Sequence, residues 1–293
     1  MPDGMTWEVL VVDNNSTDRT REIVEEFSRR YPGRFRYLFE PRAGKSYALN
    51  AGITQAKGDV AAFMDDDVTV APDWLQNLTA PLADGAFACT GGRVAPVWKT
   101  DPPHWLGRDG WVLAGPLVSF DRGEQGCRLE ECPVGTNMAF PLRVFQQYGG
   151  FRVDLGPTPH NEIRNEDSEF VRRLLKAGEQ LYYVPSAVVY HPVTEDRLNQ
   201  RYFLTWWFDK ARSEIRELGV PRDQGWLIGG IPLNTFRRLL RWSMQWTVTL
   251  NSRSRFECKL KVWYAVGLMA ECRSHTRSQP VLPEGVVGSR PIS

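Results

Sequence analysis

The chain has 293 residues, of which 42% are hydrophobic and 24% are charged, and its formal net charge is +1. This length allows one domain with a sizeable core and an appendage, and the balanced charge excludes the strongly basic class of dedicated nucleic-acid binders. Five cysteines without a Cys-x-x-Cys pair favour reduced thiols in a cytoplasmic compartment. Because the sequence shows neither a signal-peptide pattern nor a membrane-spanning apolar run, we expect no secretion and no membrane span.

The first part of the chain alternates predicted strands and helices. Residues 7–13 (WEVLVVD) are an apolar, β-rich run, and Ser16 or Thr17 can cap the helix that follows. Residues 35–40 predict a second strand, AGKSYALNAGITQAKG a second helix, and residues 59–64 a third strand of the continuous apolar kind that is buried on both faces of a parallel sheet. Strand, helix, strand, helix, strand predicts a doubly wound α/β domain.

The middle of the chain is less regular. A short helix near Trp74 precedes a strand over residues 87–98, and residues 98–131 mix Pro, Gly and Trp without a period. We expect this last stretch to be a long loop that contacts substrate or acts as a lid. The apolar spacing around Phe170 predicts a helix, which closing strands follow.

The C-terminal part is rich in aromatic residues and arginine. We expect a first domain over residues 1–195, a helical basic region over residues 196–275 and a loose tail over residues 276–293. Two interpretations of the second C-terminal helix stay open: it packs on its own domain, or it lies in a membrane interface. Its apolar stripe and the neighbouring arginines are Leu233, Phe236, Leu240 and Met244, and Arg237, Arg238 and Arg241.

Acidic residues follow two of the predicted strands. Asp13 ends the first strand, and Asp65, Asp66 and Asp67 follow the third. Ligands of α/β sheets bind beyond the carboxyl ends of the strands, so these acids mark a candidate site. Because side chains alternate along an extended segment, we expect Asp65 and Asp67 on one side and Asp66 on the other. The first two could share a divalent cation, or divide between a metal and a sugar hydroxyl; the alternative is a solvated acidic turn.

The same acids resemble a motif of another enzyme class. Residues 65–69, DDDVT, are similar to the DxDxT of haloacid-dehalogenase-type phosphatases, in which the first Asp is a nucleophile and the second an acid/base. That family also needs a downstream lysine and a further acidic strand end, and the chain has no such motif. A phosphatase is therefore the minority interpretation.

Five linked motifs resemble the family 2 glycosyltransferases, which are inverting, nucleotide-sugar-dependent enzymes. In chain order they are VLVVDNNSTDRT, GKSYALNAGI, GDVAAFMDDDV, GTNMAF and NEDSEF, and they cover roughly residues 7–195. The resemblance implies a GT-A fold, which is Rossmann-like, with a mostly parallel sheet and helices on both faces. Family members normally begin with one more strand and helix before the strand that starts here at Trp7, which implies an N-terminally short version with exposed sheet edges and doubtful activity.

The resemblance also implies roles on the side of the sugar donor. Asp13 and Asn14 would lie at the nucleobase, and Lys45 would approach the diphosphate unless it is an ordinary helix-surface lysine. Asp65 would lie near the ribose. Asp66, its neighbour on the donor side, faces away, and its replacement is expected to have the smallest effect.

The remaining implied roles concern the metal and the acceptor. Asp67 would ligate Mg²⁺ or Mn²⁺, which neutralises the departing diphosphate, and His191 is either a further metal ligand or a structural histidine. Asp167 would be the base that takes the proton of the acceptor, with Glu166 orienting substrate. The acceptor site would be bordered by Gly135 and Asn137.

The sequence thus predicts a metal-dependent inverting glycosyltransferase that uses a nucleotide sugar and a glycan, lipid-linked or other hydroxyl acceptor. Cell-envelope polysaccharide biosynthesis in the cytoplasm or at the inner face of the membrane is the expected setting, with peripheral membrane contact as one option. The alternatives are the phosphatase, which needs only Asp65, and a catalytically impaired transferase that acts as a binding or scaffold protein. A transferase needs Asp67 and Asp167.

Overall fold

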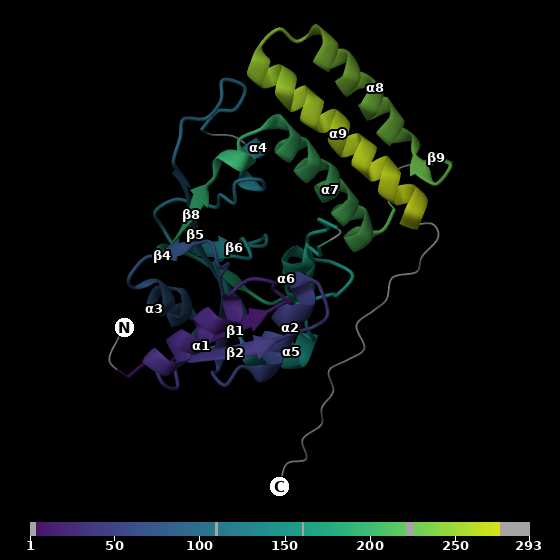
Figure 1. Ribbon diagram of the computed structural model, residues 1–293. Coiled ribbons are helices and arrows are strands. Elements are labelled where there is room, and N and C mark those ends of the chain that lie inside the picture. The colour runs from purple at the N-terminus through teal and green to yellow at the C-terminus, as the bar shows by residue number, and fades with distance from the viewer. Residues whose placement is uncertain (1–3, 109–110, 160, 221–225, 276–293) are drawn as a thin grey trace.

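The computed structural model describes residues 4–108, 111–159, 161–220 and 226–275, and the expected tail over residues 276–293 lies outside them. Strands and short helices form one part of the molecule, and three long helices, α7, α8 and α9, lie together at its other end (Figure 1). The α/β class and the helical C-terminal region agree with the sequence-based prediction.

The first layer is a parallel pair of strands with a helix between them in sequence. β1 (Val9–Asp13) pairs with β2 (Phe35–Phe39), and α1 (Thr20–Arg30) connects them. The expected cap at Ser16 or Thr17 is wrong: α1 has no side-chain cap and begins at Thr20, whose backbone N–H donates to Asp18 at 3.0 Å. This pair carries Asp13 at the end of β1.

The second layer is a mixed sheet. Its strands are β3 (Val60–Phe63), β4 (Thr69–Val70), β5 (Cys89–Trp98), β6 (Cys127–Leu129), β7 (Met138–Pro141) and β8 (Leu181–Val193). The main order is β3-β7-β5-β8-β4, with β6 also paired to β8. In the part of this sheet that the structure describes, β5 and β8 run parallel and the other pairs are antiparallel. The expectation of a mostly parallel sheet is therefore wrong in strand direction.

β3 and β1 each have one unpaired edge in the described part of the chain. β3 pairs only with β7, antiparallel, and β1 pairs only with β2. All four residues of β3 consequently stay partly exposed, which corrects the expectation of a strand buried in a parallel sheet. An edge strand has a row of free backbone donors and acceptors.

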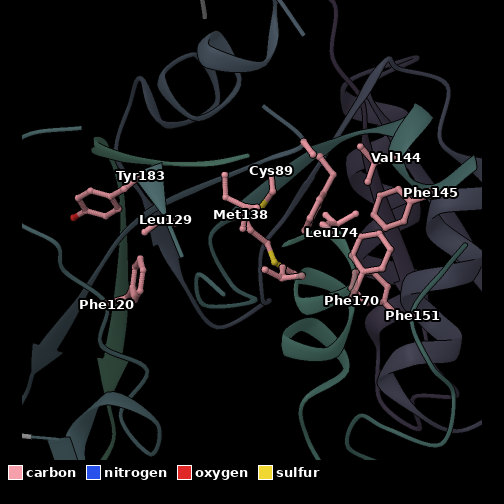
Figure 2. Close-up of a cluster of buried hydrophobic side chains, with 14 of the residues drawn as sticks. Cys89, Phe120, Leu129, Met138, Val144, Phe145, Phe151, Phe170, Leu174 and Tyr183 are labelled. Atoms are coloured by element: carbon pink, nitrogen blue, oxygen red, sulfur yellow. The ribbon is translucent and has the colours of Figure 1, made fainter. Parts of the chain in front are cut away.

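Helices around the mixed sheet complete the body. They are α2 (Lys45–Gln55), α3 (Trp74–Thr79) with the 3₁₀ turn η1 (Ala80–Leu82), α5 (Leu142–Tyr148) and α6 (Glu166–Lys176). The core between the sheet, α5 and α6 contains Phe140, Phe145, Phe151 and Phe170, and the rings of Phe145 and Phe170 stack at 4.9 Å (Figure 2). This packing fixes the position of α6, which begins at a predicted site residue.

The irregular stretch over residues 98–131 joins the body to the C-terminal helices. It contains α4 (Trp111–Ala114) and β6. Trp105 is buried, and its ring lies 5.6 Å from that of Phe203 and 4.5 Å from that of Phe256. Part of the expected loop is therefore packed against the C-terminal helices.

The C-terminal helices follow the 3₁₀ turn η2 (Glu195–Arg197). They are α7 (Gln200–Leu218), α8 (Leu233–Val248) and α9 (Ser252–His275), and the short strands β9 (Leu227–Ile228) and β10 (Ile231–Pro232) form a hairpin before α8. α9 packs against both α7 and α8. Within the described residues, no helix combines the length and the apolar content needed to cross a bilayer.

Candidate active site

Asp13 lies in a cavity at the end of β1. The cavity has a volume of about 420 Å³, and its lining includes Asp13, Ser16, Arg21, Tyr37 and Phe39. The carboxylate of Asp13 is buried and accepts hydrogen bonds from the backbone N–H of Ser16 at 2.8 Å and from the hydroxyl of Tyr37 at 2.6 Å. Burial favours the neutral acid, but these hydrogen bonds outweigh it and lower the pKa of Asp13. An ionised acceptor thus faces a cavity with an aromatic wall.

Asn14 connects β1 to the loop that precedes α2. Its side-chain amide donates to the backbone carbonyls of Glu40 and Arg42, at 2.9 and 2.7 Å, and its carbonyl accepts from the backbone N–H of Gly44 at 2.7 Å. Gly44 has a φ of 138°, which favours glycine, and it directly precedes Lys45. Asn14 therefore positions the start of α2. Through its hydrogen bond with Gly44 it connects the end of β1, which carries Asp13, to the residue before Lys45.

Lys45 brings two distant acidic segments together. Its Nζ lies 3.2 Å from Oδ1 of Asp65, just after β3, and 3.8 Å from Oε1 of Glu166, the first residue of α6. Burial opposes the charge of Lys45, but the carboxylates of Asp65, Glu166 and Asp167 outweigh this effect and raise its pKa. Lys45 and these three carboxylates form a cluster from three separate segments of the chain. Lys45 is therefore not an ordinary helix-surface lysine.

Glu166 is almost fully buried beside this lysine. Burial and the charge of Asp167 raise the pKa of Glu166 to about 7, although the charge of Lys45 opposes this rise. The folded protein therefore binds more protons than the unfolded chain between the ordinary pKa of 4.5 and the raised one. The stability that protonated Glu166 contributes is fully present below the ordinary pKa and is lost as the pH rises to about 7.

Glu166→Gln is expected to flatten this part of the stability profile. Between a pH below the ordinary pKa of 4.5 and a pH above the raised value of about 7, the unfolding free energy of the variant should rise relative to that of the wild type by about 3 kcal/mol, because the neutral amide cannot ionise. Urea unfolding at both pH values measures the difference. Glu162→Gln, at an exposed position, is the matched control and should leave the profile unchanged. Parallel pH profiles of Glu166→Gln and wild type would show that burial does not perturb this group.

Asp167 lies beside Glu166 and next to the loop before β7. Its Oδ1 accepts from the backbone N–H of Ser168 at 2.6 Å, and its Oδ2 lies 2.9 Å from the position that a Cβ would take at Gly135. Gly135 therefore leaves room for this carboxylate, and the structure brings these two predicted residues together. Asp167 is partly exposed, as a group that meets a substrate must be.

Asp67 and His191 form a second group with an arginine. Oδ2 of Asp67 lies 3.8 Å from Nε2 of the buried His191 and 3.2 Å from Nη2 of Arg197, and Nη1 of Arg197 lies 3.2 Å from the same imidazole nitrogen. Because a guanidinium has only donors, Nε2 of His191 acts as the acceptor. Burial lowers the pKa of His191 even though the charge of Asp67 opposes it. A cationic group therefore contacts both a carboxylate and a neutral imidazole.

The Asp67–His191 pair has the chemistry of a divalent-cation site. One carboxylate oxygen and one imidazole nitrogen suit Mn²⁺, and metal–ligand bonds of about 2 Å allow two ligand atoms at their observed separation to share one ion. The guanidinium of Arg197 shows that a positive charge is accommodated there. No group of three or more His, Cys, Asp or Glu side chains converges within the described residues, so a substrate and water would have to supply the other ligands.

Asp65, Asp66 and Asp67 are not equivalent in the structure. Asp65 pairs with Lys45, whereas Asp67 contacts Arg197 and His191, and Asp66 is exposed. Within the described residues, the two outer carboxylates thus contact different groups.

Asn137 has a structural position. Its side chain is fully buried, accepts from the indole N–H of Trp74 and donates to the backbone carbonyls of Arg93 and Ala187, each at 2.8 Å. The expected contact with an acceptor needs an accessible amide, so the structure corrects this expectation and gives the amide the role of joining α3, β5 and β8.

Sequence reasoning missed three residues of the site. Arg197 lies 130 positions from Asp67, Tyr37 lies on β2, and Asn165 directly precedes α6. Of these, Asn165 carries a signal in the sequence, because Asn is among the residues that adopt its left-handed conformation, with φ 77°, at a helix start. The partners of the other two depend on tertiary contacts.

Asn165 ties the start of α6 to α7. Its amide donates to Oε2 of Glu217 at 2.7 Å, and its carbonyl accepts from Nζ of Lys210 at 2.8 Å. The backbone N–H of Arg164 donates to the hydroxyl of Ser213, also at 2.8 Å. α7 therefore holds the turn that places Glu166 and Asp167.

Comparison with known proteins adds independent findings. The family model described as "Glycosyl transferase family 2" matches residues 3–149. Glycosyltransferase AglE of Haloferax volcanii is 25% identical over 80% of this chain and 69% of its own length. Glucosyl-dolichyl phosphate glucuronosyltransferase of the same organism is 28% identical over 64% of this chain and 60% of its own.

A further relative and a solved structure are also similar to this chain. Succinoglycan biosynthesis protein ExoM of Rhizobium meliloti is 27% identical over 67% of this chain and 60% of its own length. The crystal structure of GalNAc-T7 with UDP, GalNAc and Mn²⁺ aligns with a TM-score of 0.54 at 16% identity, over 92% of this chain and 51% of that one. At this identity the structural match shows the fold, which is that of GT-A enzymes. The chain spans only about 60% of the length of two of the curated relatives.

Proposed function

The chain belongs to glycosyl transferase family 2, and from this premise we propose that it transfers a sugar from a nucleotide-diphosphate sugar to an acceptor hydroxyl with inversion at the anomeric carbon. The observation that carries the proposal is the convergence of Lys45 with Asp65 and Glu166, next to Asp167. This cluster joins the ends of separate segments, as a site for a charged substrate and a base requires.

Asp167 is the proposed base. It takes the proton of the acceptor hydroxyl while the oxygen attacks the anomeric carbon and the bond from that carbon to the diphosphate breaks, so that a nucleoside diphosphate leaves. Glu166, with its pKa raised to about 7, is available in its protonated form to donate a hydrogen bond to substrate. Lys45 supplies a permanent positive charge near the departing phosphates.

The proposed donor site extends over the two other groups. The Asp13 cavity takes the nucleobase, with Tyr37 and Phe39 as aromatic walls and Asp13 as the acceptor of a base N–H. Asp67 and His191 would hold Mg²⁺ or Mn²⁺, which when bound neutralises charge on the leaving diphosphate. Arg197 then contacts phosphate oxygens, because a guanidinium binds them well.

The relatives support a glycan or lipid-linked acceptor. One is named for succinoglycan biosynthesis and another for a glucosyl-dolichyl phosphate substrate. We place the reaction in the assembly of an envelope or surface polysaccharide, in the cytoplasm at the inner face of a membrane.

A thermal-shift panel of nucleotide sugars, each with and without Mn²⁺, tests the proposal. At least one nucleotide sugar is expected to stabilise the protein with Mn²⁺, by about 2.7 kcal/mol at a ligand concentration of about 100 times its Kd. Transfer to glycan acceptors, followed by anomeric NMR of the product, tests inversion. Absence of binding to every nucleotide would favour a scaffold, and release of phosphate from simple phosphomonoesters would favour a phosphatase.

A further inference from the structure

We propose that the outer face of α8 docks on an anionic membrane surface. The inference rests on the proposed function in one respect, since it names the surface through which the protein would meet a membrane that carries its acceptor. The residues of this face, called the α8 face below, are Leu240, Met244, Val248 and Leu250, with Arg237, Arg238 and Arg241.

Large apolar side chains form a continuous exposed stripe on α8. Leu240, Met244 and Val248 are 66%, 61% and 73% exposed, and their spacing of four residues puts them on one side of the helix. Leu250, two residues after the helix, is almost fully exposed. Single exposed apolar residues are common on protein surfaces, but an ordered stripe indicates an interaction surface.

The stripe is not needed for the packing of α8. Phe236, on the inner side, packs against the cluster that contains Ile215 and Ile231, and the ring of Trp246 lies 6.0 Å from that of Trp263 on α9. The sequence placed Phe236 on one stripe with Leu240 and Met244, and the structure separates them. The inner side of α8 therefore packs on its own domain, and the membrane interpretation concerns its exposed side alone.

The charge on and near this face is strongly positive. Arg237, Arg238 and Arg241 are exposed, and α8 contains no acidic residue. Residues 233–275 contain eight Lys or Arg and two Glu, a net charge of +6, whereas the whole chain has a net charge of +1. Anionic lipid headgroups are complementary to such a surface, because each nearby basic side chain adds to the attraction.

Exposed apolar residues also precede α8. Trp226 is 84% exposed, and Leu227 and Ile228 of β9 are exposed beside it. Figure 1 shows β9 next to the beginning of α8. Exposed tryptophan and aliphatic side chains next to a basic helix are typical of an interfacial membrane contact, in which indole rings lie at the headgroup level.

A pocket at the other end of α8 suits a phosphate headgroup. It has a volume of about 330 Å³, and its walls include Trp246, Leu250, Arg255 and Lys259. Nζ of Lys259 lies 5.7 Å from the centroid of the Trp246 ring, so a cation stands over an apolar wall. Its wall also includes Gln200, the first residue of α7, three positions after Arg197. The pocket thus connects the α8 face with the segment that reaches the candidate active site.

A second copy of the chain is a poor partner for this face. Two α8 faces would bring six arginine side chains together, and like charges at an interface oppose association. An acidic lipid surface instead supplies both opposite charge and an apolar interior for Leu240, Met244 and Val248. The observations therefore favour lipid over self-association.

Vesicle sedimentation of the whole chain tests the proposal. The protein should sediment with vesicles of equal parts phosphatidylcholine and phosphatidylglycerol, and much less with phosphatidylcholine alone. The combined change Arg237→Gln, Arg238→Gln and Arg241→Gln should weaken binding to the anionic vesicles by about 100-fold, since each basic side chain contributes about one kcal/mol near such a surface. Arg19→Gln, just before α1, with Arg29→Gln and Arg30→Gln in its last turn, removes the same charge elsewhere and should change binding little.

The apolar part of the face is tested by a second change, which replaces two exposed apolar side chains with carboxylates. Leu240→Asp with Met244→Asp should lower the vesicle partition coefficient by about tenfold or more. Ile23→Asp, at an exposed position of α1, is the matched control and should leave it unchanged. Both positions of the double variant are exposed, so circular dichroism should show an intact fold.

Three results would overturn the proposal. They are equal binding of wild type to both kinds of vesicle, equal binding of the α1 and α8 charge variants, and a wild-type dimer that the Leu240→Asp, Met244→Asp variant loses without a change in vesicle binding. Because sedimentation uses no nucleotide, failure here leaves the proposed transfer reaction intact. Failure of the nucleotide-sugar panel with intact vesicle binding would affect the proposed function alone.

Discussion

Asp167→Asn is expected to lower the rate of sugar transfer by about 10²–10⁴-fold, the usual contribution of a general base. The amide keeps the size of the side chain and can still accept the hydrogen bond from Ser168, but it cannot take a proton at neutral pH. Binding of the nucleotide sugar, measured by thermal shift, should stay close to that of the wild type. Steady-state transfer assays with saturating sugar donor measure the loss.

Glu169→Gln is the matched control for this variant. Glu169 lies in the same first turn of α6, so its replacement removes the same negative charge near the helix start. Its carboxylate pairs with Arg173 and does not belong to the candidate site. If Asp167 were only an acid that stabilises the helix N-terminus, the two variants would lose stability together and keep their activity. Near-normal transfer by Asp167→Asn would contradict its assignment as the base.

Asp67→Asn is expected to lose most Mn²⁺ binding and at least about 100-fold in transfer rate. Among the described residues, Asp67 alone has a carboxylate in contact with both His191 and Arg197. Without it the imidazole would have to hold a metal with no carboxylate from this group. Isothermal titration with Mn²⁺, with and without a nucleoside diphosphate, measures the binding loss independently of activity. Asp66→Asn, at the exposed neighbour, is the control and should keep both properties.

Arg197→Ala tests two roles of this arginine, as a competitor of the metal at Asp67 and His191 and as a contact to phosphate. The guanidinium contacts the same atoms of Asp67 and His191 that would ligate a cation, so its removal should tighten Mn²⁺ binding to the nucleotide-free protein. Binding of the nucleoside diphosphate should weaken if Arg197 turns to the phosphates. Unchanged Mn²⁺ affinity in Arg197→Ala would show that this arginine does not compete with a metal.

The order of the elements could be predicted from local patterns. The apolar run before Asp13 and the helical spacing after Lys45 are local signals, and both elements occur where periodicity predicts them. The family resemblance put Lys45 and Asp65 on the donor side, but their direct contact is a tertiary feature that local patterns did not predict. The direction of β3 was not predictable, because an apolar run does not reveal which neighbour it pairs with.

The rest of the site depends on distant parts of the chain. Arg197 meets Asp67 only because β8 runs beside β4 and ends near the acidic segment. The sequence predicted Asn137 at the border of the acceptor site. In the structure its amide instead forms hydrogen bonds with three elements that lie far apart in the sequence. Side-chain direction on α8 depended on the position of α9, which periodicity alone does not give.

The contacts of Asn165 set a lower limit on the length of an active fragment. The family match ends at residue 149, yet the turn before Glu166 is held by Lys210, Ser213 and Glu217 of α7. A shortened protein that ends after η2 would keep every proposed catalytic residue and still lose the support that orients two of them. Deletion series intended to find the smallest transferase should therefore retain α7 through Leu218.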